Sequence, residues 1–483
     1  MEGSTVSLFT DKIGLRDIYF FSATDIIVIS SHLDTLRYFT ELKIDFKVFG
    51  TSWMCVNKIS HKSLYKNVTR LVRGMKATIN SSDLSFKIDS DEWLPEIPCD
   101  SEDFHTPRSV YSDFNEHLLS LLSFKDTQMV LGLSGGMDSR ILLSVLLKSQ
   151  FPNWTTHTTG SESDPDRIVA TQIKKNFNIP SITAFEETDI RSFNIDKLQE
   201  FCFTTCINHP VTSFFSLMNI NDSEADGRIF IDGGFGEIWR REFFNALLWN
   251  SYKGIKNADP KKIANGIRFE RGKIFNNDIH TEMANGIPEQ VEEIINLLPP
   301  ANKIGIENWV DLFAVKTRIP NYYSPEQTRI DPLIDNYMPF LQLSLLNKML
   351  SIPLNLKKNG QLVREIIRLN YSPLTKFPLI KGDTKLPFGF STFNARLITK
   401  IKKKILKSKK KNIESPLFLL KEYALDTVNS TVFYQSGIYN NNLQNYVTEF
   451  FKTEREEYRF IIENWLSFSL SESYSKKQTP KIS

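Results

Sequence analysis

The chain has 483 residues, a net charge of +3, 41% hydrophobic residues and 24% charged residues. This length predicts more than one domain, and the composition excludes disordered, collagen-like and disulfide-scaffold proteins. The nearly balanced charge argues against a nucleic-acid partner, and four cysteines are too few to staple so long a chain. We expect a cytoplasmic protein without a transmembrane segment, because the sequence shows neither a signal-peptide pattern nor a long apolar run.

The N-terminal part is predicted to be rich in β-structure. Short runs of β-branched and aromatic residues at 18–21 and 26–30 predict two strands. Arg73-Gly74 predicts a turn before a further strand at 76–79. Polar, proline-containing sequence follows from residue 89 to 106. We therefore expect a β-rich domain over residues 1–92 and a linker over residues 93–107.

The pattern changes after the linker, because apolar runs of strand length alternate with segments of helical periodicity. Strands are expected at 128–133, 154–159 and 228–232, and helices at 110–122, 139–147 and 167–177. This alternation predicts an α/β fold with a parallel sheet over residues 108–395. The remaining residues, 396–483, are expected to form a basic and aromatic helical extension, including one packed helix at 448–470.

The most informative segment joins a predicted strand directly to an apolar helix and reads Leu133-Ser134-Gly135-Gly136-Met137-Asp138-Ser139. Two glycines let backbone N–H groups point inward, and the helix N-terminus adds partial positive charge, so the segment favours anion binding. An acid inside a phosphate site needs a cation between them, so Asp138 suggests Mg²⁺. The alternative is a tight connection in which Ser139 merely caps the helix.

Residues 134–139 resemble the PP-loop of the ATP pyrophosphatases. Over residues 105–390 the chain is similar to the synthetase domain of glutamine-hydrolysing asparagine synthetases, whose relatives include β-lactam synthetases and lasso-peptide cyclases. Further similar segments follow in the family's order: Thr158-Thr159-Gly160, Ile231 to Glu237, Arg329 with 331–335, and Val363-Arg364-Glu365. The resemblance implies a PP-loop domain that binds ATP and Mg²⁺.

The resemblance also implies roles for individual residues. The catalytic residues would be Asp138, Glu237 and Arg364, and Asp138 and Glu237 would hold the metal, with Asp232 as an alternative ligand. The nucleotide would contact Leu133, Ser134, Gly135, Gly136, Asp138, Ser139, Thr159, Asp232 and Gly233.

The chain also departs from the family at several positions. Gly360 replaces a family lysine, while Arg240 and Arg241 stand where the family has glycines and would bring positive charge near the phosphates. We expect Arg140 either to pair with phosphate or to face solvent.

The N-terminal segments 11–20 and 64–74 are similar to the second half of the family's glutaminase domain, which implies a small, partial Ntn-type domain. The family's catalytic cysteine at position 2 is replaced by Glu2, and the first cysteine is Cys55. Glutamine hydrolysis is therefore not expected, because its acyl intermediate forms on sulfur.

The implied function is an AMP- and pyrophosphate-forming ligase that adenylates a small-molecule or peptide carboxylate and forms an amide, as in amino-acid biosynthesis. Ammonia or a substrate amine would supply the nitrogen. Two alternatives stay open: a macrocycle-forming ligase like the β-lactam synthetases and lasso-peptide cyclases, and a nucleotide-binding pseudoenzyme or scaffold.

Two further patterns have competing interpretations. Eight lysines between Lys400 and Lys411 suit either a solvated helix face or peripheral contact with a membrane surface or another polyanion. Cys202, Cys206 and His209 share one helical face, which suits either core packing or the start of a zinc site. His157, in a predicted strand, is expected to be structural.

Overall fold

The computed structural model describes residues 5–55, 58–97, 107–124, 127–149, 151–160, 162–182, 194–204, 210–214, 227–240, 245–331, 334–381, 384–390, 398, 416–453 and 456–478. The stretch Lys400–Lys411 lies outside these residues, as do Cys206, His209 and Arg241. The predictions made for them therefore stay predictions. Within the described residues, no helix combines the length and the apolar character that crossing a membrane requires.

A four-stranded parallel sheet forms the centre of the α/β part, as the sequence predicts. Its strands are β7 (Gln128–Gly132), β8 (Trp154–His157), β9 (Arg228–Ile231) and β10 (Asp335–Tyr337). The spatial order is β10-β9-β7-β8, and every neighbouring pair is parallel. The chain therefore leaves β7 on one side to form β8 and returns on the other side to form β9. This reversal between β7 and β9 creates a crevice at the carboxyl ends of the strands, where open α/β sheets bind ligands.

The two faces of this sheet are covered differently. Met129, Leu131 and Ile231 belong to the main hydrophobic core, together with the apolar residues of α3 (Met137–Ser149). Helices α2 (Pro107–Leu121) and α17 (Gln361–Tyr371) pack against α3, so α3 is covered on several sides, as its apolar sequence predicts. On the opposite face, Val130 and Phe230 form a small separate cluster.

The N-terminal region forms two antiparallel three-stranded sheets, in the orders β1-β5-β6 and β3-β2-β4. The strands are β1 (Thr5–Phe9), β2 (Ile18–Ser22), β3 (Ile27–Ser30), β4 (Thr69–Leu71), β5 (Met75–Asn80) and β6 (Phe86–Ser90). The predicted strands at 18–21, 26–30 and 76–79 are confirmed. Gly74 has a φ of +61° in the turn that precedes β5, which explains a glycine at this position.

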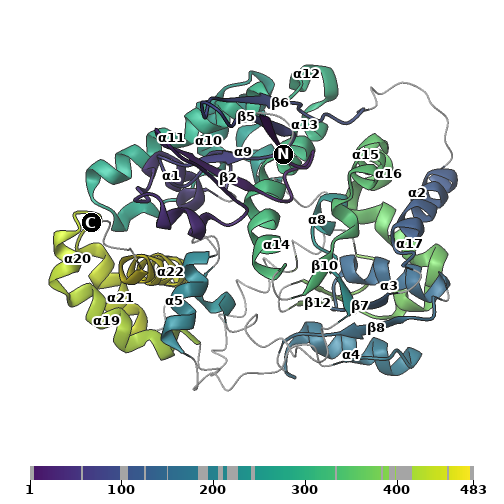
Figure 1. The fold of residues 1–483 in the computed structure, drawn as a ribbon. Coiled ribbons are helices and arrows are strands. Elements are labelled where there is room, and N and C mark those ends of the chain that lie inside the picture. Colours follow the sequence, from purple (N-terminus) through teal and green to yellow (C-terminus); the bar gives the residue numbers. More distant parts are fainter. Residues whose placement is uncertain are drawn as a thin grey trace.

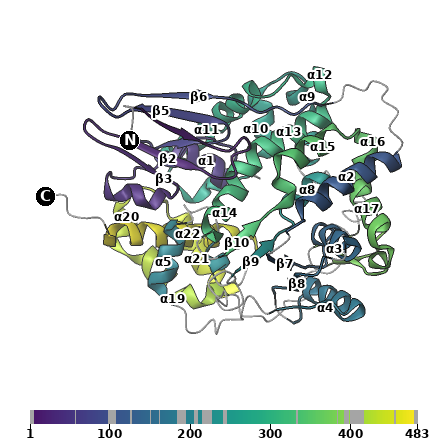
Figure 2. The same cartoon turned by 45° about the vertical axis from the view of Figure 1, so that its right-hand side comes forward.

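Helix α1 (Phe46–Met54) joins the N-terminal region to the central helices. It packs against α11 (Asn277–Asn296), and glycine on each helix allows the close approach: a β-carbon on Gly50 or Gly286 would collide with the backbone of the other helix. The remaining helices of this part are α9 (Asn245–Lys256), α10 (Pro260–Ile267), α12 (Ala301–Ile304), α13 (Ile306–Arg318), α14 (Ser324–Ile330), α15 (Leu343–Ser351) and α16 (Leu354–Lys357). In Figures 1 and 2, α14 lies between the purple N-terminal strands and the parallel sheet.

The C-terminal part is helical, as expected, and packs beside α5 (Ile195–Thr204) (Figure 1). Its helices are α19 (Lys421–Asn429), α20 (Thr431–Gln435), α21 (Asn442–Thr453) and α22 (Glu456–Gln478). The prediction of one helix at 448–470 is wrong, because this sequence is divided between α21 and α22. Each helix buries its own aromatic residues, Phe450 and Phe451 in α21 and Trp465 in α22, so the apolar periodicity alone did not show that two helices share this sequence.

Candidate functional site

The candidate site is a cavity of about 490 Å³ at the carboxyl ends of the parallel strands. It receives residues from the segments that follow β7, β8 and β9 and from the region around β10, so it lies at the reversal point of the sheet. Its lining residues are Gly132, Ser134, Asp138, Ser139, His157, Thr159, Phe230, Ile231, Asp232, Gly233, Gly234, Glu237, Glu326, Ile330, Ile334 and Asn336.

The loop between β7 and α3 is closed by its own serines. The backbone N–H of Ser134 donates to Oγ of Ser139 at 3.1 Å, and the N–H of Gly136 donates to Oγ of Ser134 at 3.1 Å. The two hydroxyl oxygens are also 3.1 Å apart. The hydroxyls thus hold the loop in a compact shape at the helix N-terminus, where the partial positive charge favours anions.

Gly135 lies in a narrow space between two other elements. The N–H of Ile380, in β11 (Leu379–Lys381), donates to the carbonyl oxygen of Gly135 at 3.1 Å. The N–H of Gly135 donates to the carboxylate of Asp166, near the start of α4 (Pro165–Phe177). A β-carbon on Gly135 would lie 2.5 Å from Cγ1 of Ile380, so glycine is required by the close approach of β11. Burial raises the pKa of Asp166, and the charge of Asp164 adds to this effect.

The expectation that Arg140 faces solvent is wrong, because its side chain is fully buried, and its guanidinium is already engaged by backbone carbonyl groups. Its guanidinium donates to the carbonyl oxygens of Gly135, Phe377 and Pro378 at 3.1, 2.9 and 2.8 Å. Burial lowers its pKa to about 10. The physical reason is that these buried carbonyl groups need donors, and the planar guanidinium supplies several at once. Arg140 therefore ties the loop to the segment before β11.

The loop after β9 lies directly against the start of α3. A β-carbon on Gly233 would lie 3.1 Å from the backbone nitrogen of Ser139. A β-carbon on Gly236, the first residue of α8 (Gly236–Trp239), would lie 2.5 Å from Oδ1 of Asp138. The carboxylate of Asp138 thus fills the space in which a side chain at position 236 would lie. This leaves Glu237 and Asp232, rather than an acid at 236, as carboxylates beside Asp138.

Two arginines pair with the carboxylates that the sequence proposes as metal ligands. Nη2 of Arg240 lies 2.8 Å from Oδ2 of Asp138, and Nη2 of Arg318 lies 2.9 Å from Oε1 of Glu237. The hydroxyl of Tyr323 also donates to Glu237 at 3.0 Å. Glu237 is therefore held from two sides by the chain itself.

Tyr323 keeps its proton, because burial and the charge of Glu237 raise its pKa well above the usual value. Its hydroxyl oxygen also accepts from the backbone N–H of Phe235 at 2.8 Å. Phe235 has a φ of +69°, a left-handed conformation that costs about 1 kcal/mol or more in a residue with a side chain. Strain of this kind often persists at functional sites, where surrounding contacts fix it. Here the contact with Tyr323 fixes the start of α8.

The donor set fits a metal that arrives on a phosphate group better than a metal held by protein alone. Among the described residues, no three His, Cys, Asp or Glu side chains group as a metal site. Mg²⁺ commonly takes one or two carboxylates and completes its shell with phosphate oxygens and water. Asp138 and Asp232 line the cavity and can serve in this way. Surrounding protein atoms desolvate the carboxylate of Asp232 and raise its pKa, and the negative charge of Glu237 raises this pKa further.

Other residues proposed from the sequence take different places. Thr159 lines the cavity, whereas Leu133 is buried in the core. Arg364 is not among the cavity-lining residues, and its guanidinium donates to the carbonyl oxygens of Asn359, Phe388 and Phe390. The geometry thus favours a structural contribution for Arg364, and its catalytic role stays a prediction.

Several residues of the site carry no pattern that predicts them from the sequence. Arg318 and Tyr323 hold Glu237, and Glu326, Ile330, Ile334 and Asn336 line the cavity. They come from α13, the π-helical segment that follows it (Ile319–Tyr323), α14 and the β10 region, far from the glycine loops in sequence. Of these segments, only Arg329 with residues 331–335 was linked to the site from the sequence, through its resemblance to a family segment.

His157 and Gly132 are neighbours in the register of β7 and β8, on the face that bears Val130 and Phe230. A β-carbon on Gly132 would lie 3.3 Å from Nε2 of His157. The missing side chain at 132 therefore leaves a hollow in the sheet beside the imidazole. Burial lowers the pKa of His157 to about 4, and the charge of Lys174 contributes, so the ring is neutral near pH 7.

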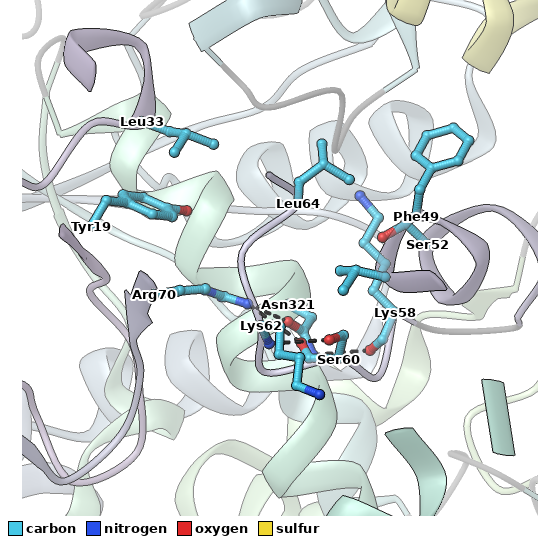
Figure 3. A pocket seen from close by; sticks show the side chains of 11 residues that line it. Tyr19, Leu33, Phe49, Ser52, Lys58, Ser60, Lys62, Leu64, Arg70 and Asn321 are labelled. Carbon is cyan, nitrogen blue, oxygen red and sulfur yellow. Dashed lines mark hydrogen bonds between the residues drawn. The ribbon is translucent and has the colours of Figure 1, made fainter. Parts of the chain in front are cut away.

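A second cavity lies where the N-terminal strands meet the central helices (Figure 3). It measures about 50 Å³, enough for only a few water molecules. Arg70, Ser60 and Asn321 line it and are linked by hydrogen bonds. Cys55, the first cysteine of the chain, is also buried. Burial raises the pKa of its thiol to about 12, so the thiol keeps its proton. The 50 Å³ cavity itself is too small for a nucleotide or an amino acid.

Comparisons with known proteins do not identify the chain. No protein-family model matches it, and none of the curated proteins matches it. The case for a function therefore depends on the geometry of the cavity and on the residues that line it.

Proposed function

We propose that the chain is an ATP-dependent carbon–nitrogen ligase of the asparagine synthetase type, which adenylates a carboxylate, releases pyrophosphate and forms an amide. One observation carries this proposal: the Ser134–Ser139 loop and the Gly233–Glu237 loop meet at the reversal point of a parallel sheet, with Asp138 between them. A helix N-terminus with two adjacent hydroxyls suits phosphate, and the acid beside it suits a phosphate-bound cation.

The charge of the cavity supports this assignment. Asp138, Asp232, Glu237 and Glu326 line it, whereas none of the described residues in its lining is lysine or arginine. Arg240 and Arg318 pair with two of these acids, and a divalent cation that accompanied a polyphosphate would offset the remaining repulsion. When bound, Mg²⁺ would neutralise phosphate charge during attack by the carboxylate. Ser134 and Ser139 would turn their hydroxyls toward the phosphates, and Asp138 and Asp232 would hold the metal.

The departures from the family are consistent with retained chemistry. The resemblance places a lysine at position 360 and a glycine at position 240, whereas this chain has glycine and arginine there. The structure brings the two positions together, since a β-carbon on Gly360 would lie 3.5 Å from Cγ of Arg240. We propose that Arg240 supplies the positive charge from α8, and that ammonia or an amine of the substrate supplies the nitrogen.

A nucleotide-binding pseudoenzyme is the second candidate. The observation that favours it is the pairing of Asp138 and Glu237 with arginines, together with the engagement of Arg364 by three backbone carbonyl groups. Such a protein would bind a magnesium–nucleotide complex without activating any carboxylate.

Two measurements separate these candidates. Calorimetry with MgATP should detect binding to the wild-type chain, and Asp138→Asn should weaken it at least tenfold. Asp113→Asn is the matched control, because Asp113 is an exposed acid paired with Lys348. Carboxylate-dependent exchange of pyrophosphate into ATP would support the ligase, and binding without exchange across a panel of amino acids and peptides would favour the pseudoenzyme. Absence of MgATP binding by folded protein would refute both.

A further inference from the structure

Arg240 lies at the carboxyl end of α8, and its side chain reaches across to the start of α3. Its Nη2 atom is 2.8 Å from Oδ2 of Asp138, and the two side chains are about one fifth exposed, at 19% and 23%. A charge-assisted hydrogen bond of this length in a partly desolvated position is among the stronger polar contacts in proteins. The pair therefore competes with any other cation for the carboxylate of Asp138.

The path of Arg240 depends on Gly360. A β-carbon on Gly360 would lie 3.5 Å from Cγ of Arg240, so the arginine stem passes directly over this glycine. Gly360 has a φ of +70° and precedes α17. A long side chain at position 360 would compete with the arginine for the same space. The glycine thus leaves Arg240 room to reach Asp138 and to change its direction.

A phosphate group bound at the Ser134–Ser139 loop would be an alternative anionic partner for Arg240. Asp138 is part of the Ser134–Ser139 loop, so a phosphate bound at this loop would lie close to the guanidinium of Arg240. Guanidinium pairs with phosphate in a bidentate manner, as it does with carboxylate. A metal that accompanies the phosphate would at the same time take over the Asp138 carboxylate.

We propose that Arg240 is an exchangeable counter-ion: it holds Asp138 until a metal–nucleotide complex binds, and then moves to the phosphates while the metal takes its place. This inference rests on the proposed nucleotide site. It makes metal binding depend on the nucleotide, because Asp138 is released to a cation only when a phosphate draws Arg240 away. The alternative is a fixed ion pair that simply joins α8 to α3.

Binding measurements with Mn²⁺ as the metal and α,β-methylene-ATP as the nucleotide test this proposal without requiring turnover. Arg240→Ala should tighten Mn²⁺ binding about tenfold without nucleotide, and should weaken binding of the metal-free nucleotide by a similar factor. The gain in Mn²⁺ affinity should vanish in the double variant with Asp138→Asn. Arg459→Ala is the matched control, because Arg459 pairs with Glu463 within α22, and it should change neither affinity.

The possible results are distinguishable. If wild-type protein binds the Mn²⁺–nucleotide complex but Arg240→Ala changes neither affinity, the pair is structural and the proposal is overturned. If wild-type protein binds no nucleotide at all, the proposed function itself fails. Arg240→Gln retains a hydrogen-bond donor while removing the charge, so it provides the same test should Arg240→Ala fail to fold.

Discussion

Gly360 and Arg240 are in contact across the site: a β-carbon on Gly360 would lie 3.5 Å from Cγ of Arg240 and 3.3 Å from Nη1 of Arg364. Glycine at this position therefore accommodates two arginines and also adopts a φ of +70°. The residue matters both for the backbone that leads into α17 and for the path of the side chain that pairs with Asp138.

Gly360→Ala is expected to destabilise the protein by about 2 kcal/mol, because a side chain at positive φ is strained and the added methyl group crowds Arg364. Urea unfolding would measure the change. Gly437→Ala separates the two causes, since Gly437 has a φ of +61° and open space around its β-carbon position. It should show the backbone cost alone, and an equal loss in both variants would disprove the crowding.

Gly236→Ala should weaken MgATP binding while the protein still folds. The new methyl group would lie 2.5 Å from Oδ1 of Asp138, so the carboxylate must turn away from its present position. Calorimetry should show at least a tenfold weaker affinity, or about 1.4 kcal/mol. Gly389→Ala is the control, because a β-carbon there meets nothing within 4 Å. Unchanged affinity in Gly236→Ala would show that the position of Asp138 is unimportant for binding.

Arg140→Ala should destabilise the protein by about 3 kcal/mol, since it leaves several buried carbonyl groups without donors. The affected acceptors include the carbonyl groups of Gly135, Phe377 and Pro378, through which Arg140 joins the Ser134–Ser139 loop to the segment before β11. Arg368→Ala removes an arginine that is paired with Glu365 but is about half exposed, so it should cost less than about 1 kcal/mol. Similar losses in the two variants would contradict the role assigned to Arg140.

His157 should make the stability depend on pH below neutrality. Its pKa in the folded protein is about 4, whereas an unfolded histidine has a pKa near 6.5. The unfolded chain therefore binds a proton first, so this contribution is complete above pH 6.5 and is lost as the pH falls toward 4. Because His157 also lines the cavity, where water screens its charge, we expect a loss of roughly 2 kcal/mol.

The comparison with His157→Gln isolates this effect from the titration of the acids. Unfolding free energies of the two proteins should converge between pH 7 and pH 4.5, because the variant lacks the group that titrates. Buried His61, whose pKa also lies well below its usual value, contributes equally to both proteins and cancels. Parallel pH curves would mean that His157 is accessible enough to take up a proton in the folded state.

The parallel sheet and its glycine loops were predictable because their signals are local. A compact apolar run, two glycines and an apolar helical segment occur within residues 128–147. They predict a strand, a tight turn and a helix in that order. The partners of Glu237 were not predictable, because Arg318 and Tyr323 reach this acid from helices distant in sequence. Arg140 shows the same limit: its place in the first turn of α3 was evident, but its burial depends on β11, more than two hundred residues later.

Arg70, which lines the small cavity of Figure 3, forms a buried ion pair with Asp17. Nη2 of Arg70 lies 2.7 Å from Oδ2 of Asp17, and both side chains are at most 7% exposed. Arg70 also donates to Asn321, so the pair connects β2 and β4 to the central helices. Asp17→Ala should cost about 3 kcal/mol or more, since it leaves a buried cation without its carboxylate.

Arg70→Met should be less costly at low pH than at neutral pH. Burial raises the pKa of Asp17, with Arg70 opposing it, so removal of Arg70 lets Asp17 take up a proton as the pH falls. An acid with a raised pKa favours the folded state as the pH decreases, which means that the penalty should shrink between pH 8 and pH 5. The double variant should be more stable than the sum of the two losses predicts, by about 1 kcal/mol or more. Strict additivity in urea unfolding would show that the two charges do not stabilise each other and that the junction is held by its apolar contacts.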